Sequence, residues 1–153
     1  MANLVYNYFK KALLSGSVGL GDINGTASVG GTATQLFLAL VSNSYSPNVD
    51  TDIYLSSLTN VVAPSNYVAY FALSSPSVVS DTGGDQGILF ASNILMANVT
   101  FGTSVRAGVL FCSSALGNSS SPLVSYIDFT TDQAVTAGSF QIQWAAGGVL
   151  AIT

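Results

Sequence analysis

Residues 104–113, with the sequence SVRAGVLFCS, alternate between two sets of side chains, and this alternation predicts the fold class. Side chains that repeat every two residues point to the same face of a β-sheet, so the stretch is predicted to be a strand. The first set comprises Val105, Ala107, Val109 and Phe111, and the second comprises Arg106, Gly108, Leu110 and Cys112.

The same period of two recurs near the end of the chain, in FQIQW at 140–144. Phe140, Ile142 and Trp144 are expected to face the core, and the two intervening glutamines to face solvent. The glycines at 147 and 148 then predict a tight hairpin turn before a last strand in VLAIT.

Further strands are predicted from apolar stretches that are separated by turn-forming residues. The stretch TQLFLALVS at 34–42 is almost continuously apolar, which is typical of a core strand. Residues 88–101 are expected to hold one long strand or two short ones, whereas 53–62 fit a short helix slightly better than a strand. The remaining predicted strands are 67–73 and 123–129, with turns in 43–52, 74–87 and 130–138. Many short strands joined by such turns predict an all-β protein, an antiparallel β-sandwich or barrel of jelly-roll-like type.

The N-terminal segment is predicted to contain a short amphipathic helix over residues 3–14. Asn3 is expected to be its N-cap, and Gly16 to end it in the left-handed conformation. The helix either caps the core of its own chain, which we favour, or packs on a partner subunit. Residues 15–33 are rich in glycine and serine and predict a loop, with a turn at Asn24-Gly25. We therefore expect a single β domain over 1–153, with 1–33 as an N-terminal helix and arm that can contact a neighbouring subunit.

The composition excludes several classes of function. Only 7% of the 153 residues are charged, and histidine and glutamate are absent. Without histidine the chain has no imidazole general base and no histidine metal ligand. The single cysteine excludes an intramolecular disulfide and a thiolate zinc site. A net charge of −4 with three cations argues against nucleic acid and anionic membranes as partners, and no apolar run reaches the roughly 18 residues of a membrane helix.

Three pairs of aspartates are the groups best suited to acid-base chemistry or metal binding. They are Asp50 with Asp52, Asp81 with Asp85, and Asp128 with Asp132. Aspartates stabilise turns through local hydrogen bonds, and none of these loops has the spacing of a twelve-residue calcium loop. We therefore interpret them as turn residues, and we predict no enzymatic activity, no catalytic residue, no cofactor and no metal site.

Three further side chains have specific interpretations. Cys112 is expected to be a small buried hydrophobic residue. Arg106, the only arginine, is expected either to pair with one of the aspartates or to anchor an interface, and both readings stay open. Tyr45 lies in a polar loop and is expected to be the most exposed of the seven tyrosines.

Three segments resemble small virion structural proteins of tailed bacteriophages. They are YFKKALLSGSV at 8–18, ALVSNSYSPNVDTDIYLSSLTN at 39–60, and SPLVSYIDFTTDQAVTAGSFQIQWAAGGVLAIT at 121–153. The last segment is the most distinctive, with the residues Tyr126-Ile127-Asp128-Phe129, Asp132-Gln133, Gly138, Phe140 and Trp144. The chain departs from the resemblance in 19–33 and 112–121, where the charges expected of that family are missing.

The resemblance implies a non-enzymatic virion protein, in the first place a capsid decoration (cement) protein on the outer capsid surface. Its implied partners are the major capsid protein and further copies of itself, with a homotrimer as the first expectation. One alternative is a component of the tail, neck or fibre base. Another is a carbohydrate-binding host-attachment module, for which Tyr45, Tyr54 and Tyr67 would have to supply an aromatic platform.

Overall fold

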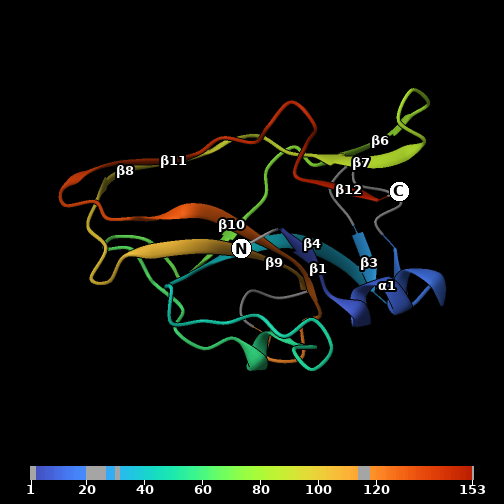
Figure 1. Cartoon of the computed structure of the whole chain (residues 1–153), viewed down its shortest axis with the longest axis horizontal. Helices are drawn as coiled ribbons and strands as arrows, with labels where there is room; N and C mark the ends of the chain where they lie inside the picture. Colours follow the sequence, from blue (N-terminus) through green and yellow to red (C-terminus); the bar gives the residue numbers. More distant parts are fainter. Residues whose placement is uncertain (1–2, 20–26, 30–31, 114–117, 153) are drawn as a thin grey trace.

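The structure, a computed structural model, describes residues 3–19, 27–29, 32–113 and 118–152. Its strands are all paired in antiparallel fashion and form two packed layers (Figure 1), which confirms the predicted all-β sandwich. The described strands do not close into a barrel. The predicted turn at Asn24-Gly25 lies outside the described residues.

The first layer is a seven-stranded sheet with the order β1-β10-β9-β4-β3-β2, to which β5 adds by pairing with β4. Its central pair, β4 with β9, keeps an unbroken register from Gln35 opposite Ser113 to Val41 opposite Ala107. The strands are β1 (Leu4–Val5), β2 (Val18–Gly19), β3 (Ala27–Val29), β4 (Thr32–Val41), β5 (Tyr70–Ala72), β9 (Val105–Ser113) and β10 (Leu123–Gln133).

The second layer consists of two small sheets that lie over one face of the first (Figure 1). One pairs β8 (Ile94–Val99) with β11 (Gly138–Ile142). The other has the order β12-β7-β6, with β6 (Ser77–Asp81), β7 (Gln86–Phe90) and β12 (Leu150–Ile152). Residues 88–101 therefore hold two short strands, the second of the two predicted possibilities.

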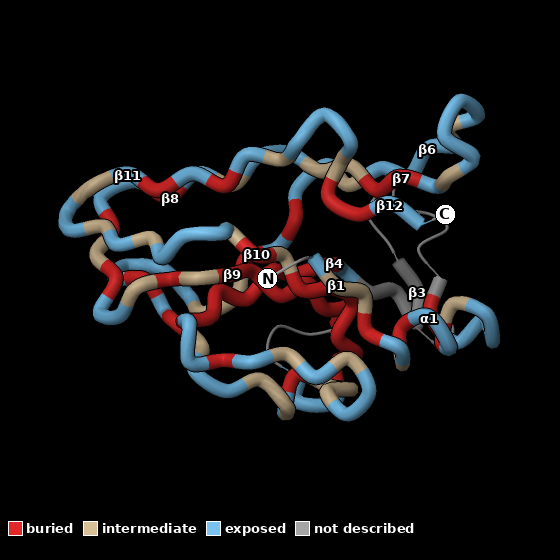
Figure 2. The backbone as a smooth tube through the Cα atoms, viewed as in Figure 1, coloured by how far each residue is buried: buried red, intermediate tan, exposed pale blue. Residues whose placement is uncertain are grey.

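Both faces of the first layer are covered, which explains the nearly continuous apolar sequence of β4 (Figure 2). Leu36, Leu38 and Leu40 belong to the larger core cluster, which also includes residues of the second layer such as Leu89 and Met96. The intervening residues of β4 belong to a smaller cluster on the opposite face, together with Tyr45 and Leu55 from the segment that follows β4. That cluster contains Tyr6, Phe37, Ala39, Val41, Tyr45, Leu55, Ala107, Val109, Phe111, Leu123 and Tyr126.

The N-terminal helix is shorter than predicted. α1 runs over Asn7–Leu14, because Leu4 and Val5 pair with Tyr126 and Ser125 as the edge strand β1. Asn3 is therefore not the N-cap, and its side-chain oxygen instead accepts a hydrogen bond of 3.0 Å from the backbone of Asp128.

The predicted end of the helix is confirmed at Gly16, whose φ is +67°. Its amide donates to Leu13, and the amide of Ser17 donates to Ala12, the paired bonds of a Schellman motif. The buried residues Phe9 and Ala12 pack α1 on the core of its own chain.

Several other elements differ from the sequence predictions. The expected helix at 53–62 is a single 3₁₀ turn, η1 (Leu55–Ser57). Backbone amides that a longer helix would use internally instead donate to distant carbonyls, as the amide of Leu55 does to Ser121. Residues 130–133, predicted as turn, continue β10 through a bulge, with Thr130 at φ +66°. Strand β6 was predicted as part of a turn region, and β2 and β3 lie in the predicted loop.

Candidate interaction surface

Arg106 pairs with aspartates, which resolves one of its two open interpretations. Its Nε donates to Asp128 at 2.7 Å, and a terminal nitrogen lies 3.6 Å from a carboxylate oxygen of Asp132. The bulge in β10 makes this possible, since Asp128 pairs with Ala107 but Gln133 pairs with Val105, so extra residues of β10 lie opposite Arg106. The hydrogen bond from Arg106 holds the pKa of Asp128 well below its usual range.

Asp81 and Asp52 accept local hydrogen bonds, as the turn interpretation predicts, and the amide of Asn48 donates to Asp52 at 2.9 Å. Asp81 accepts from the amide of Gly83 and from the side chain of Gln86, and these two bonds lower its pKa. Asp50 instead accepts from the side chain of Asn7, 43 residues away in α1, at 2.6 Å. Among the described residues no three acidic, cysteine or histidine side chains gather into a group that could hold a metal ion.

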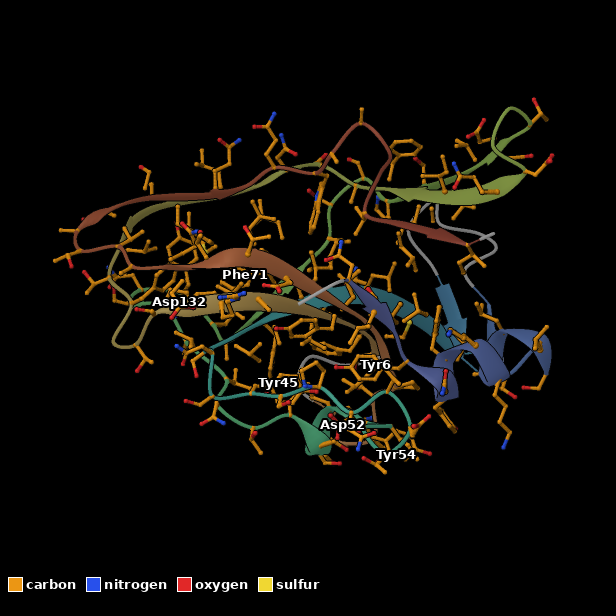
Figure 3. All side chains as sticks on the ribbon, viewed as in Figure 1. Tyr6, Tyr45, Asp52, Tyr54, Phe71 and Asp132 are labelled. Carbon is orange, nitrogen blue, oxygen red and sulfur yellow. The ribbon has the colours of Figure 1, made fainter. Side chains whose placement is uncertain are left out.

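The prediction that Tyr45 is exposed was wrong. Only 4% of Tyr45 is exposed, and its hydroxyl lies between Tyr6 and Asp52 (Figure 3). The Tyr45 hydroxyl donates its proton to Asp52 at 2.8 Å. In the 2.8 Å hydrogen bond between the two tyrosine hydroxyls, Tyr6 is therefore the donor and Tyr45 the acceptor. Burial raises the pKa of both phenols. The two tyrosines and Asp52 therefore form one hydrogen-bonded chain that joins the helix start to the 45–52 loop.

The three tyrosines considered for a sugar platform do not act together. Tyr45 is buried, Tyr54 packs edge-on against Tyr8 at a ring distance of 5.4 Å, and Tyr67 lies beside Phe71 at 6.1 Å. The hydroxyl of Tyr67 also accepts a hydrogen bond from the amide of Ala97. These three tyrosines therefore do not form the shared aromatic platform that the carbohydrate-binding alternative needs.

Cys112 is buried, as predicted, and its exposure is 0%. Burial raises the pKa of its thiol to about 12, so the thiol stays protonated and unreactive at neutral pH. It therefore acts as a core residue of β9.

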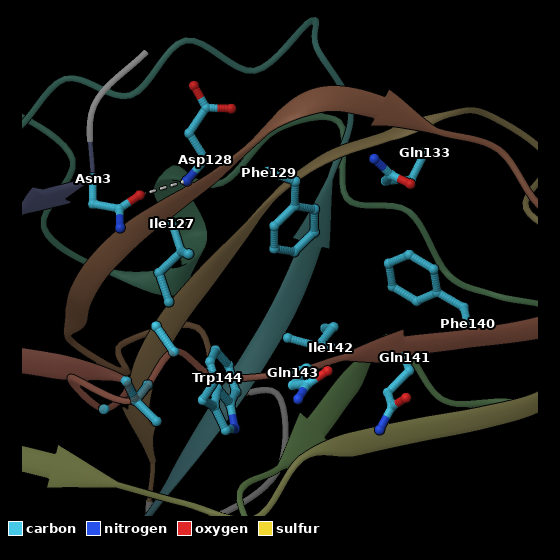
Figure 4. Close-up of a pocket in the computed structure, with 13 residues that line it drawn as sticks. Asn3, Ile127, Asp128, Phe129, Gln133, Phe140, Gln141, Ile142, Gln143 and Trp144 are labelled. Carbon is cyan, nitrogen blue, oxygen red and sulfur yellow. Dashed lines mark hydrogen bonds between the residues drawn. The ribbon is translucent and has the colours of Figure 1, made fainter.

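A cleft of about 440 Å³ lies between β10 and the β11 segment, at the open edge of the sandwich (Figure 4). Its walls include Ile127, Phe129, Phe140 and Trp144, while the carboxylate of Asp128 points away from it. The indole nitrogen of Trp144, predicted to face the core, donates to the carbonyl of Ser92 at 2.9 Å just beyond the end of β11. The lining thus combines these apolar side chains with amides such as those of Gln133 and Gln141, and it directs no charged group at a ligand.

The most exposed apolar strand lies in the three-stranded sheet β12-β7-β6. From here on, "the arm" means residues 77–90, which form β6, β7 and their turn (Figure 1), and not the N-terminal segment. Val78 is 49% exposed, Val79 is 43% exposed, and Ile152 on the neighbouring β12 is 41% exposed. Val78 shares a face with Leu89 and Leu150, and Ile152 lies on that same face, because alternate residues point the same way. An apolar face therefore continues from the core out onto the arm.

The base of the arm is held firmly in the core. Leu89 is 2% exposed, and its carbonyl accepts a hydrogen bond of 2.7 Å from Val149. Gly148, with φ +83°, allows the 145–148 turn to lie against β7, since a Cβ there would meet Ile88 at 2.5 Å. This surface was not predicted from the sequence, because Pro76 and the glycines of the turn indicated a loop and only two adjacent valines suggested a strand.

Comparison with protein-family models, with curated proteins and with solved structures gives no match to the chain. In the described part of the chain, no helix has both the length and the apolar character needed to cross a bilayer. The interpretation of the arm therefore depends on its own geometry and on the resemblance found in the sequence.

Proposed function

We propose that this protein is a non-enzymatic structural component of a bacteriophage particle, a decoration protein on the outer surface of the capsid. The observation that carries the proposal is the arm face on which Val78 and Ile152 remain exposed beside the buried Leu89. Apolar side chains left exposed on the core-facing side of a sheet suit a contact with another molecule. The resemblance to small virion proteins supplies the identity of that molecule, the major capsid protein.

The weakly charged surface suits such a contact. Only 7% of the residues are charged, and residues 77–90 contain two aspartates and no cation. Few charges therefore lose their hydration when the arm is buried, which lowers the desolvation cost of a large interface. A protein that binds only the assembled lattice stabilises that lattice by mass action. Binding as a symmetric oligomer, with a trimer as the first expectation, would let one molecule span several capsid subunits.

Locating the protein in purified particles tests the proposal. We expect cryo-electron microscopy of the particles that contain it to place its density on the outer capsid lattice. Density in the tail or neck would instead make the protein a structural component of the tail, neck or fibre base, and would exclude the decoration role. Particles that lack the protein altogether would show that the resemblance is misleading.

A binding assay tests the arm itself. Val78→Asp should weaken binding to undecorated capsids about tenfold, because burying the rest of a half-exposed valine contributes roughly 1 kcal/mol and a buried carboxylate adds a cost. Leu95→Asp is the matched control, since Leu95 is 64% exposed on β8, outside the arm. Equal binding by the two variants would exclude the arm as the capsid contact.

A further inference from the structure

We infer that the outer edge of β6 pairs with β6 of a second copy of this chain, antiparallel about a two-fold axis at Val79. Among the described residues β6 has a strand partner on one side, β7, and its other edge faces solvent (Figure 2). The inference concerns this backbone edge, whereas the proposed function concerns the apolar face of the arm.

The edge of β6 lacks the features that usually prevent strands from pairing between molecules. Such edges are commonly protected by lysine, by proline within the strand, or by a bulge. Residues 77–80 read SVVS without a charge, and Pro76 precedes the strand. The register with β7 runs from Ser77 opposite Phe90 to Asp81 opposite Gln86 without a shift. A regular edge of five residues, uncharged except for Asp81 at its end, is therefore open to a further strand.

The sequence of β6 is complementary to itself in one register. A two-fold axis at Val79 places Val79 opposite its own copy, Val78 opposite Ser80, and Ser77 opposite Asp81. Valine pairs directly opposite each other stabilise antiparallel strands, and the serine hydroxyl can donate to the aspartate. No two like charges face each other, and the pairing adds about four to six backbone hydrogen bonds.

The negative charges of the two arms do not oppose this contact strongly. The two Asp81 carboxylates lie at opposite ends of the paired strands, about 14 Å apart along the strand direction at 3.4 Å per residue. That separation exceeds the screening length of about 8 Å at physiological ionic strength. Each Asp81 also already accepts hydrogen bonds within its own turn. The result is a continuous six-stranded sheet across the axis, with the Val78 face of both copies on the same side.

The oligomeric state of the isolated chain tests the inference. Sedimentation equilibrium over a concentration series should show a dimer of the 15.7 kDa chain. Val79→Lys should weaken the dimer about tenfold, because it places two cations directly opposite each other. The matched control is Val78→Lys, which places its cation opposite Ser80 and should weaken the dimer much less. Circular dichroism and a melting curve establish that both variants fold.

Cross-linking tests the register. In Val79→Cys the two thiol positions lie about 5 Å apart, so a short bis-maleimide should join them. In Ser77→Cys the two positions lie about 14 Å apart, and the same reagent should leave the copies separate. The native Cys112 is fully buried and does not compete. A monomer at every concentration, a trimer insensitive to Val79→Lys, or equal cross-linking at 77 and 79 would each overturn the inference. The assay uses no capsid, so it tests the pairing of β6 separately from capsid binding. A dimer would replace the trimer named above as the first expectation and would leave the decoration role standing.

Discussion

Replacing Tyr45 by phenylalanine should cost more stability than replacing Tyr6, although the two hydroxyls share one hydrogen bond. The Tyr45 hydroxyl is the middle member of the chain, accepting from Tyr6 and donating to Asp52, each at 2.8 Å. Its removal loses both bonds and leaves the Tyr6 hydroxyl, on a residue with 0% exposure, without its acceptor. A net hydrogen bond contributes about 1 kcal/mol and a stranded buried donor costs about 1 to 3 kcal/mol, so we expect a loss of about 2 to 4 kcal/mol.

Tyr6→Phe removes only the end of the chain. Tyr45 keeps its stronger bond to the Asp52 carboxylate, so the expected cost is about 1 kcal/mol. In a protein that already carries Tyr45→Phe, the same change removes the stranded hydroxyl and should cost nothing or restore some stability. The double variant should therefore be no less stable than Tyr45→Phe alone, which makes the two substitutions strongly non-additive.

Urea unfolding of the four proteins at neutral pH measures these free energies, provided that the slope with urea stays constant. Tyr67→Phe is a suitable control, because the Tyr67 hydroxyl is exposed and bonds only to the backbone of Ala97. Equal costs for the two single variants, or additivity within about 0.5 kcal/mol, would refute the reasoning from a directional chain.

Other expected outcomes follow from single contacts. The lowered pKa of Asp128 means that its contribution to stability is complete above about pH 4 and is lost as the pH falls below that. Asp128→Asn should therefore flatten the acid side of the stability profile in urea titrations, and an unchanged profile would contradict the pairing with Arg106. Cys112 should react with a thiol reagent only at the rate of unfolding, because its pKa is raised to about 12 by burial; fast labelling of the native protein would contradict this. Gly148→Ala should cost at least about 2 kcal/mol, from its positive φ and the close approach of Ile88, whereas Gly147→Ala, with open space around it, should cost far less in the same unfolding assay.

The strands of the core could be predicted because their signal is local. The alternation in 104–113 and the apolar sequence of β4 each place side chains on faces by geometry alone, whatever the partner. The end of α1 was equally local, since Gly16 adopts the left-handed conformation there. Its start was not, because Leu4 and Val5 suit a helix face but gain more by pairing with β10.

The contacts of the polar residues depended on partners distant in sequence. Tyr45 lies in a polar segment, yet it is buried because Tyr6, 39 residues away, and Asp52 satisfy its hydroxyl. Arg106 pairs with two aspartates because a bulge places extra residues of β10 opposite it. No pattern in the sequence predicts that bulge. The exposed strand β6 escaped prediction because short turn signals surround two valines that the core does not cover.

The sequence by itself determined the all-β class, the low charge, and the lack of any imidazole group. Those properties depend on composition and on a two-residue period, which do not require knowledge of distant neighbours. Only the tertiary structure decided which apolar residues remain uncovered, which edge of a sheet stays open, and which hydroxyls are buried. Burial is a property of the packed layers, so valines are core residues in β9 and surface residues in β6.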